Sequence, residues 1–179
     1  MRGAEGYAPV AKLLHWLVAL LVLGMIGLGL WMVDLPLGLA KLYAYAWHKW
    51  IGLTVLVLTV LRLAWRAWRP PPTLPPTVTA WERAIAPWSH GLLLVLLVAL
   101  PVSGWLMSSA GGVTVYWFGY LQLPDLVPRD TLTFEMLRTL HHQLAWLLIG
   151  VLVVHVGAVV HHDVLRRDGI FRRMLPFGS

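Results

Sequence analysis

The 179-residue chain contains no cysteine and little charge of either sign. Without cysteine it cannot form disulfides, thiolate-bound zinc sites, iron–sulfur clusters or thioether-linked prosthetic groups. Charged residues make up 12% of the chain, against about 25% in an ordinary soluble domain. The sequence also has no phosphate-binding glycine loop and no internal repeat. With 59% hydrophobic residues and a mean hydropathy of +0.72, it is the sequence of an integral membrane protein.

Four apolar stretches are long enough to cross a hydrocarbon layer, which takes about 20 helical residues. They run from Leu13 to Val33 and over about 47–68, 88–107 and 140–160. We read the first as an uncleaved helix, because its apolar run is too long for a signal peptide and no Ala-x-Ala site follows. The sequence therefore predicts an all-α membrane protein, a single four-helix bundle with no separate soluble domain.

The distribution of basic residues predicts the orientation of the bundle. Ten of the fourteen Lys and Arg fall on one side: Arg2, Lys12, Arg62, Arg66, Arg69, Arg83, Arg166, Arg167, Arg172 and Arg173. That side should face the cytoplasm and hold both termini, a Pro-rich loop (69–83) and a basic tail (163–179). The connections 34–46 and 108–138 should then face outward. The net charge of +6 requires no nucleic acid, because anionic lipid accounts for it.

Pro101 and Gly104 are expected to kink the third stretch. Most of the eleven tryptophans lie near predicted helix ends, where aromatic rings occupy the membrane interface.

Histidines carry the candidate chemistry. His141 and His155 are fourteen residues apart, so a helix brings them to one face within roughly 40° and about 21 Å apart along the axis. Matching depths across helices pairs His48 with His141 near the outside and His15 with His155 near the inside. Each pair could hold one haem iron from opposite sides, because helical bundles build cofactor sites from inward-facing side chains.

Other residues are open to two interpretations. Packing is the favoured role for His90, His142 and His161, and the fourteen-residue interval favours His141 over His142. Arg62, fourteen residues after His48, either binds a haem propionate or extends to the cytoplasmic interface. Glycines that accompany the paired histidines permit a flat ligand or plain helix packing: Gly24, Gly27, Gly29, Gly52, Gly150 and Gly157.

Taken in order, the motifs resemble the bacterial cytochrome b561 family over nearly the whole chain. They are an early His-Trp-Leu-Val, a second-stretch His followed by Arg and a Pro-rich loop, Ser-His-Gly, His-x13-His ending in His-His, and an Arg-Asp-Gly-Ile-Phe-Arg-Arg-Met-Leu-Pro tail. The resemblance implies two non-covalent b-type haems with bis-histidine ligation, carried here by His15, His48, His141 and His155.

Some relatives within this family resemble superoxide oxidase, which passes electrons from periplasmic superoxide to ubiquinone on the inner side. The resemblance then places His162 near the quinone and the chain in a bacterial inner membrane. Lys49 and Arg138 lie beside the outer histidines and are candidates to attract the superoxide anion. The outer segments nevertheless carry four acidic residues that balance the four basic ones, so any attraction must be local.

Three functions remain open from the sequence. The first is a superoxide:ubiquinone oxidoreductase that works alone. The second is a cytochrome b subunit of a hydrogenase- or formate dehydrogenase-like complex, which would take electrons from a partner protein. The third is a histidine-lined proton or metal transporter, which would hold no haem. The oligomeric state and the redox potentials cannot be predicted from the sequence.

Overall fold

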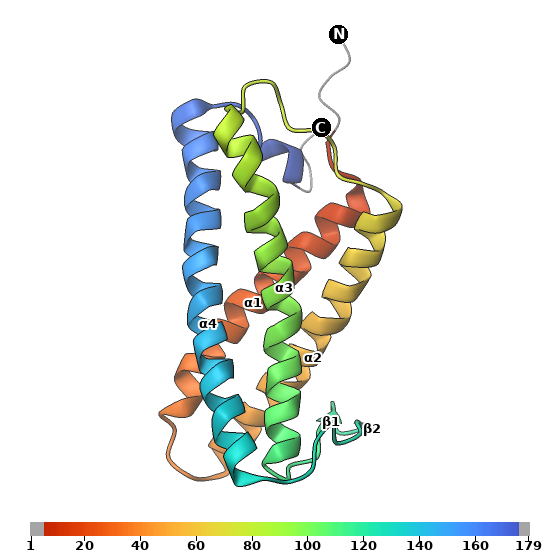
Figure 1. Cartoon of the computed structure of the whole chain (residues 1–179), viewed down its shortest axis with the longest axis vertical. Helices are drawn as coiled ribbons and strands as arrows, with labels where there is room; N and C mark the ends of the chain where they lie inside the picture. Colours follow the sequence, from red (N-terminus) through yellow and green to blue (C-terminus); the bar gives the residue numbers. More distant parts are fainter. Residues whose placement is uncertain (1–5, 176–179) are drawn as a thin grey trace.

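The computed structural model of the chain describes residues 6–175 and has four long helices (Figure 1). They are α1 (Pro9–Val33), α2 (Leu39–Trp68), α3 (Ala80–Ala110) and α4 (Thr131–Val160). Each is long and apolar enough to cross a membrane, which confirms the predicted all-α, multi-pass architecture. Arg2 and the last four residues of the predicted tail lie outside the described residues.

Two short elements complete the outer end and two the inner end. A hairpin on the outer side pairs β1 (Tyr116–Trp117) with β2 (Leu121–Gln122) in antiparallel register. On the inner side, the π-helical turn η1 (His161–Arg166) continues α4, and the 3-10 turn η2 (Arg172–Met174) follows it. The hairpin was not predicted. The first part of the predicted basic tail is helical, because it belongs to η1.

Each helix begins earlier than its apolar stretch, which corrects the predicted connections. Residues 34–38 link α1 to α2, residues 69–79 form the Pro-rich loop, and residues 111–130 form the long outer connection. Side chains cap the added turns of α3 and α4. The Thr79 hydroxyl bonds the Glu82 carboxylate, which also accepts the Thr79 amide, and Asp130 accepts the Thr133 amide at 2.7 Å. These Thr133 bonds lower the pKa of Asp130.

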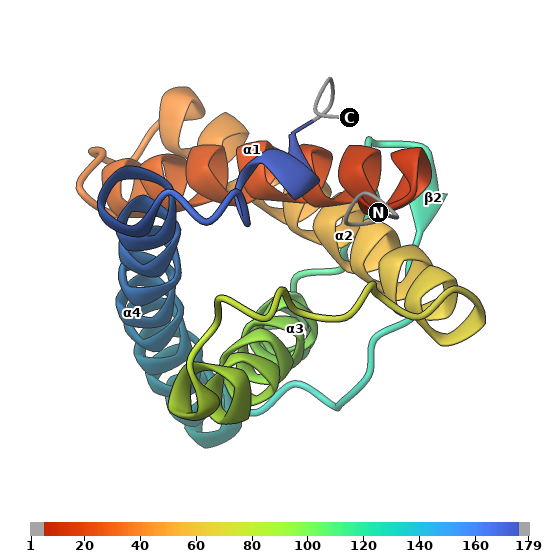
Figure 2. The same cartoon turned by 90° about the horizontal axis from the view of Figure 1, so that it is seen from above.

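The third helix runs unbroken through both of its prolines, Pro87 and Pro101. Viewed from above, the four helices surround a central region in chain order (Figure 2). Neighbours pack as α1 on α2, α2 on α3, and α3 on α4. Every helix can therefore present one face to the centre and the opposite face to lipid.

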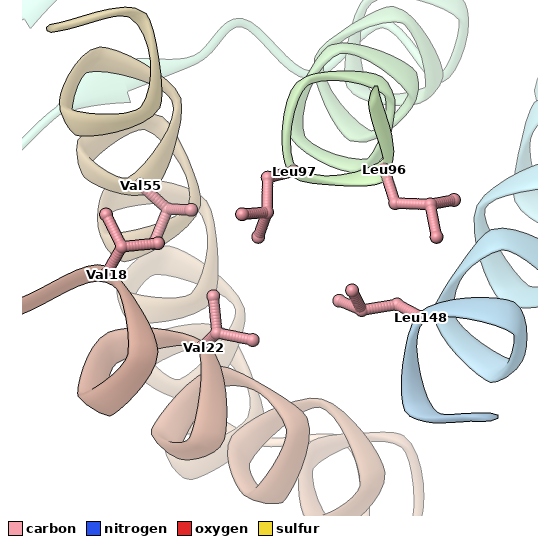
Figure 3. Packing of buried hydrophobic residues seen from close by; sticks show 6 residues of the cluster. All are labelled: Val18, Val22, Val55, Leu96, Leu97 and Leu148. Carbon is pink, nitrogen blue, oxygen red and sulfur yellow. The ribbon is translucent and has the colours of Figure 1, made fainter. Parts of the chain in front are cut away.

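The core lies halfway along the bundle. Its buried side chains converge from all four helices (Figure 3): Val18, Val22, Val55, Leu96, Leu97 and Leu148. Large apolar side chains on the outward faces, such as Leu13, Leu20 and Val153, are exposed. This distribution is typical of a membrane bundle, whose outer surface is covered by lipid tails rather than water.

The inner end is closed by the segment that follows α4. The Trp16 indole donates to the Met174 carbonyl at 2.9 Å, and Arg173 donates to the Thr73 carbonyl in the Pro-rich loop at 3.0 Å. The Tyr7 amide in turn bonds the Arg173 carbonyl at 3.3 Å. These bonds bring residues near both ends of the chain to the same end of the bundle.

The outer end is covered by the hairpin, which two indoles attach to α2. Trp50 donates to the Tyr116 carbonyl at 2.5 Å, and Trp117 donates to the Thr54 hydroxyl at 3.3 Å. Phe118 turns the hairpin with a left-handed φ of 49° and packs on Trp47 and Trp50. The result is an aromatic cover beside the outer half of α2.

We expect Leu148→Ala to destabilise the bundle by about 3 kcal/mol, because a buried leucine at the meeting point of four helices leaves a cavity when truncated. Leu147→Ala is the matched control, since its neighbouring side chain is 47% exposed toward lipid. Thermal melting in detergent, followed by circular dichroism, measures both. Equal melting temperatures for the two variants would contradict the central position of Leu148.

Candidate functional site

A seven-residue interval places the candidate residues on one face of each helix. Seven helical residues advance about 10.5 Å and return within roughly 20° of the starting direction. The intervals arrange twelve residues in three layers, which we name by position. The outer layer holds Gly29, His48, Gly104 and His141; the apolar layer holds Val22, Val55, Leu97 and Leu148; the inner layer holds His15, Arg62, His90 and His155.

The outer layer brings two imidazoles together. The rings of His48 from α2 and His141 from α4 lie with their centroids 6.3 Å apart and an interplanar angle of 74°. The Nδ1 atom of His48 is buried and has no hydrogen-bond partner. A buried polar atom without a partner is costly, so this ring is poised for a ligand that the protein itself does not supply.

Hydrogen bonding determines the tautomer of His141. The Ser103 hydroxyl donates its single proton to the Leu100 carbonyl at 2.8 Å, and its oxygen lies 2.9 Å from His141 Nδ1. The Ser103 oxygen can then only accept, so His141 carries its proton on Nδ1. Its Nε2 lone pair is then available to bind a metal. Metal-binding histidines usually have this arrangement, in which the other ring nitrogen donates its proton to a neighbouring protein group.

Glycines make room for both outer imidazoles. A Cβ atom on Gly29 would lie 3.2 Å from His48 Cε1, and one on Gly104 would lie 3.2 Å from His141 Cε1. Gly104 therefore has a packing role that the sequence interpretation, which treated it as part of a kink, did not include. Gly24, Gly27, Gly150 and Gly157 face open space, so the structure gives them no close contact.

The inner layer holds three histidines where two were predicted. The rings of His90 and His155 are 5.4 Å apart, and His15 lies within electrostatic range of both. The sequence interpretation treated His90 as a packing residue. His90 lies fourteen residues before Gly104, with Leu97 midway between them. This spacing is the sequence signal that would have placed His90 in the inner layer. His15 Nδ1, like His48 Nδ1, is buried without a partner.

Arg62 completes the inner layer and interacts electrostatically with all three of its histidines. Among residues 6–175 its half-buried guanidinium forms no ion pair with a carboxylate. A cation in this position favours an anionic partner from outside the chain.

Beyond the inner layer, His162 follows His155 by seven residues and lies among charged groups. Its Nδ1 is 2.5 Å from an Asp168 carboxylate oxygen, and its Nε2 is 3.9 Å from a Glu82 oxygen. Arg166 holds the same Glu82 carboxylate through bonds of 2.8 and 2.7 Å. Sequence reasoning singled out His162 alone, because no local pattern joins it to Glu82 on another helix.

The outer basic residues are not equivalent. Arg138 forms an ion pair with Glu135 at 2.7 Å, and the Lys41 ammonium bonds the Val33 and Leu35 carbonyls at the end of α1. Arg129 packs against Gly112. Lys49 forms no ion pair with any described carboxylate, and of the outer basic residues without one it is the residue next to His48.

The remaining histidines lie off the layered faces. His142 is exposed and accepts a bond from the Trp146 indole at 3.0 Å on the outward face of α4. His161 is also exposed and contacts the ring of His162. Within residues 6–175, no group of three or more His, Asp or Glu side chains is arranged to hold a bare metal ion.

Comparison with known proteins identifies the family. The family described as prokaryotic cytochrome b561 matches residues 6–177. The chain is 33% identical to cytochrome b561 homolog 2 of Escherichia coli (strain K12), covering 98% of this chain and 94% of that protein. It is 28% identical to the probable superoxide oxidase CybB of Yersinia pestis, covering 91% and 92%. The chain is therefore a member of the prokaryotic cytochrome b561 family, whose proteins carry electrons across membranes.

Proposed function

We propose that this protein is a superoxide:ubiquinone oxidoreductase of a bacterial inner membrane. It would take electrons from superoxide on the periplasmic side and deliver them, through two b-type haems, to ubiquinone on the cytoplasmic side. The observation that carries the proposal is the presence of two histidine layers at different depths, separated by an apolar layer. The similarity to a probable superoxide oxidase supports the choice of electron donor.

Family membership implies b-type haem, and the residues of the outer layer fit one. His48 and His141 would be the ligands, because His48 has an unpartnered buried nitrogen and the Ser103 bond leaves His141 Nε2 available. Gly29 and Gly104 let these rings approach the helix backbones closely. His142 is unsuited as a ligand here, since its Nε2 already accepts the Trp146 indole.

The inner layer fits a second haem. His15 and His155 would be its ligands, as family membership implies, and His15 again offers an unpartnered buried nitrogen. Arg62 would pair with a propionate, which supplies the anion that the described residues do not. His90 would remain beside the site as a neighbour of His155.

A haem held by two imidazoles exchanges single electrons and offers no open position for oxygen. The balanced reaction is two superoxide anions plus one ubiquinone plus two protons giving two oxygen molecules and one ubiquinol. The chain contributes a positive charge at Lys49 to attract the anion, an apolar layer that excludes water between the two sites, and a proton-exchanging imidazole at His162 on the quinone side.

We expect His155→Ala to lose the inner haem and keep the outer one, halving the haem content of the purified protein. His162→Ala should keep both, because His162 interacts with Asp168 and Glu82 rather than with the inner layer. Pyridine haemochrome assays and reduced-minus-oxidised spectra measure the content. Loss of a haem in His162→Ala would refute the ligand assignment on α4. A wild-type protein without any b-type spectrum would favour the third function, a histidine-lined proton or metal transporter.

We expect superoxide to reduce the haems of the purified protein rapidly and ubiquinone to reoxidise them, with no partner protein present. A steady enzymatic source of superoxide and stopped-flow absorption spectra measure both steps. Added superoxide dismutase is the control, since it removes the donor. Haems that stay oxidised under the superoxide flux would instead indicate a protein donor, as in a hydrogenase- or formate dehydrogenase-like complex.

We expect Lys49→Gln to slow haem reduction by superoxide several-fold at low ionic strength, because it removes a positive charge next to His48 that no described carboxylate balances. Arg138→Gln is the matched control and should have a smaller effect, since Glu135 already balances Arg138. The difference between the variants should shrink as salt screens the charges. Equal rates for Lys49→Gln and wild type at low salt would exclude steering by Lys49.

A further inference from the structure

The segment after α4 folds back so that one of its carboxylates meets His162. The π-helical turn ends at Arg166, and the next residue, Arg167, adopts the left-handed conformation with φ 52° and ψ 37°. This reversal brings the Asp168 amide to the His162 carbonyl at 3.3 Å and the Asp168 side chain to His162 Nδ1. The other Asp168 oxygen accepts the Ile170 amide at 3.2 Å. Both oxygens of this carboxylate are therefore engaged.

Asp168 is among the most enclosed charged groups of the inner end. Its side chain is 3% exposed, and that of His162 is 13% exposed. A left-handed non-glycine residue and a π-helical turn are both locally unfavourable backbone conformations. The surrounding structure must stabilise them, and together they bring Asp168 into contact with His162. The contact also determines a tautomer, because a carboxylate can only accept and His162 must then carry a proton on Nδ1.

The opposite nitrogen of the ring faces a second carboxylate. Glu82 comes from the first turn of α3 and lies 3.9 Å from His162 Nε2, which is too long for a hydrogen bond. Arg166 and the Thr79 hydroxyl hold Glu82 in place. Glu82, Asp168 and Arg166 together carry a net charge of −1, two negative and one positive, so a proton on His162 brings the group to neutrality. Two more titratable side chains are adjacent to His162 in the chain, the exposed ring of His161 and the carboxylate of Asp163.

We propose that Asp168 is a positioning residue for proton delivery to the reduced quinone, an inference that rests on the proposed function. By holding Nδ1–H, Asp168 makes His162 Nε2 the atom that exchanges protons, and Glu82 balances the charge of the ring while both nitrogens are protonated. In each turnover the quinone gains two electrons from the haems and two protons. His162 Nε2–H gives one proton to one quinone oxygen and is reprotonated from the cytoplasm, and the other quinone oxygen takes the second proton from cytoplasmic water.

Asp168→Asn tests the proposal. Asparagine retains an acceptor for the Ile170 amide but can donate to His162 Nδ1, which favours the wrong tautomer. In haem-loaded protein we expect haem reoxidation by a short-chain ubiquinone to slow about 100-fold, a typical contribution of general acid catalysis. Haem reduction by superoxide should keep its wild-type rate, because that step takes up no proton. Asp163→Asn is the matched control: it lies in the same turn, and its carboxylate forms no described ion pair.

A second readout does not depend on turnover. In protein labelled with ¹⁵N-histidine, the His162 signal is the one lost in His162→Gln, and its shifts should report an Nδ1–H ring in wild type and Asp163→Asn but not in Asp168→Asn. Glu82→Gln retains the capping bonds, so it should keep this tautomer while slowing reoxidation. It therefore also tests the site if Asp168→Asn does not fold.

The outcomes separate the two proposals. If wild-type haems are not reoxidised by the quinone, the proposed function is wrong whatever Asp168 does. If wild type is reoxidised and Asp168→Asn matches it, or if the wild-type His162 ring carries its proton on Nε2, the role of Asp168 is wrong and the proposed function stands.

Discussion

The interval of seven residues on four antiparallel helices is the constraint on which the structure depends. Because seven residues nearly complete two turns, each helix repeats its inward face at three depths. On α4 the repeat is His141, Leu148 and His155, which η1 continues with His162, and α2 carries His48, Val55 and Arg62 in the same outer-to-inner direction. Chemistry and packing therefore alternate along one face, and neither can shift without displacing the other.

The apolar layer separates the outer histidine layer from the inner one. Val22, Val55, Leu97 and Leu148 are all buried, although much of the surrounding helix surface is exposed to lipid. In a membrane no hydrophobic force drives helices together, so close packing at this level must supply much of the association. The same contacts exclude water between the histidine layers.

Much of this arrangement could be predicted from the sequence, and the rest depended on contacts between distant residues. Helix number and the heptad relation of His141 to His155 follow from apolar length and helical geometry. Helix ends did not, since the Thr79–Glu82 and Asp130 caps extend α3 and α4 beyond the apolar runs. His90 was assigned to packing because that is the more common role of a single histidine in an apolar segment, and no partner histidine was matched to it. Asp168 reaches His162 only through the left-handed Arg167, which no sequence pattern signals.

The two ends of the bundle differ in a way that matches their proposed tasks. The outer end is covered by indoles and Phe118, with Lys49 unpaired by any described carboxylate beside His48, and electron transfer from an anion needs no proton there. The inner end is closed by Asp168, Glu82 and Arg166 around an imidazole, and quinone reduction consumes two protons. If electrons instead flowed outward, the proton-consuming step would take place at the outer end. Among the described residues, the outer end has no buried His–carboxylate pair comparable to His162 and Asp168. The asymmetry of the two ends matches the inward electron flow that we propose.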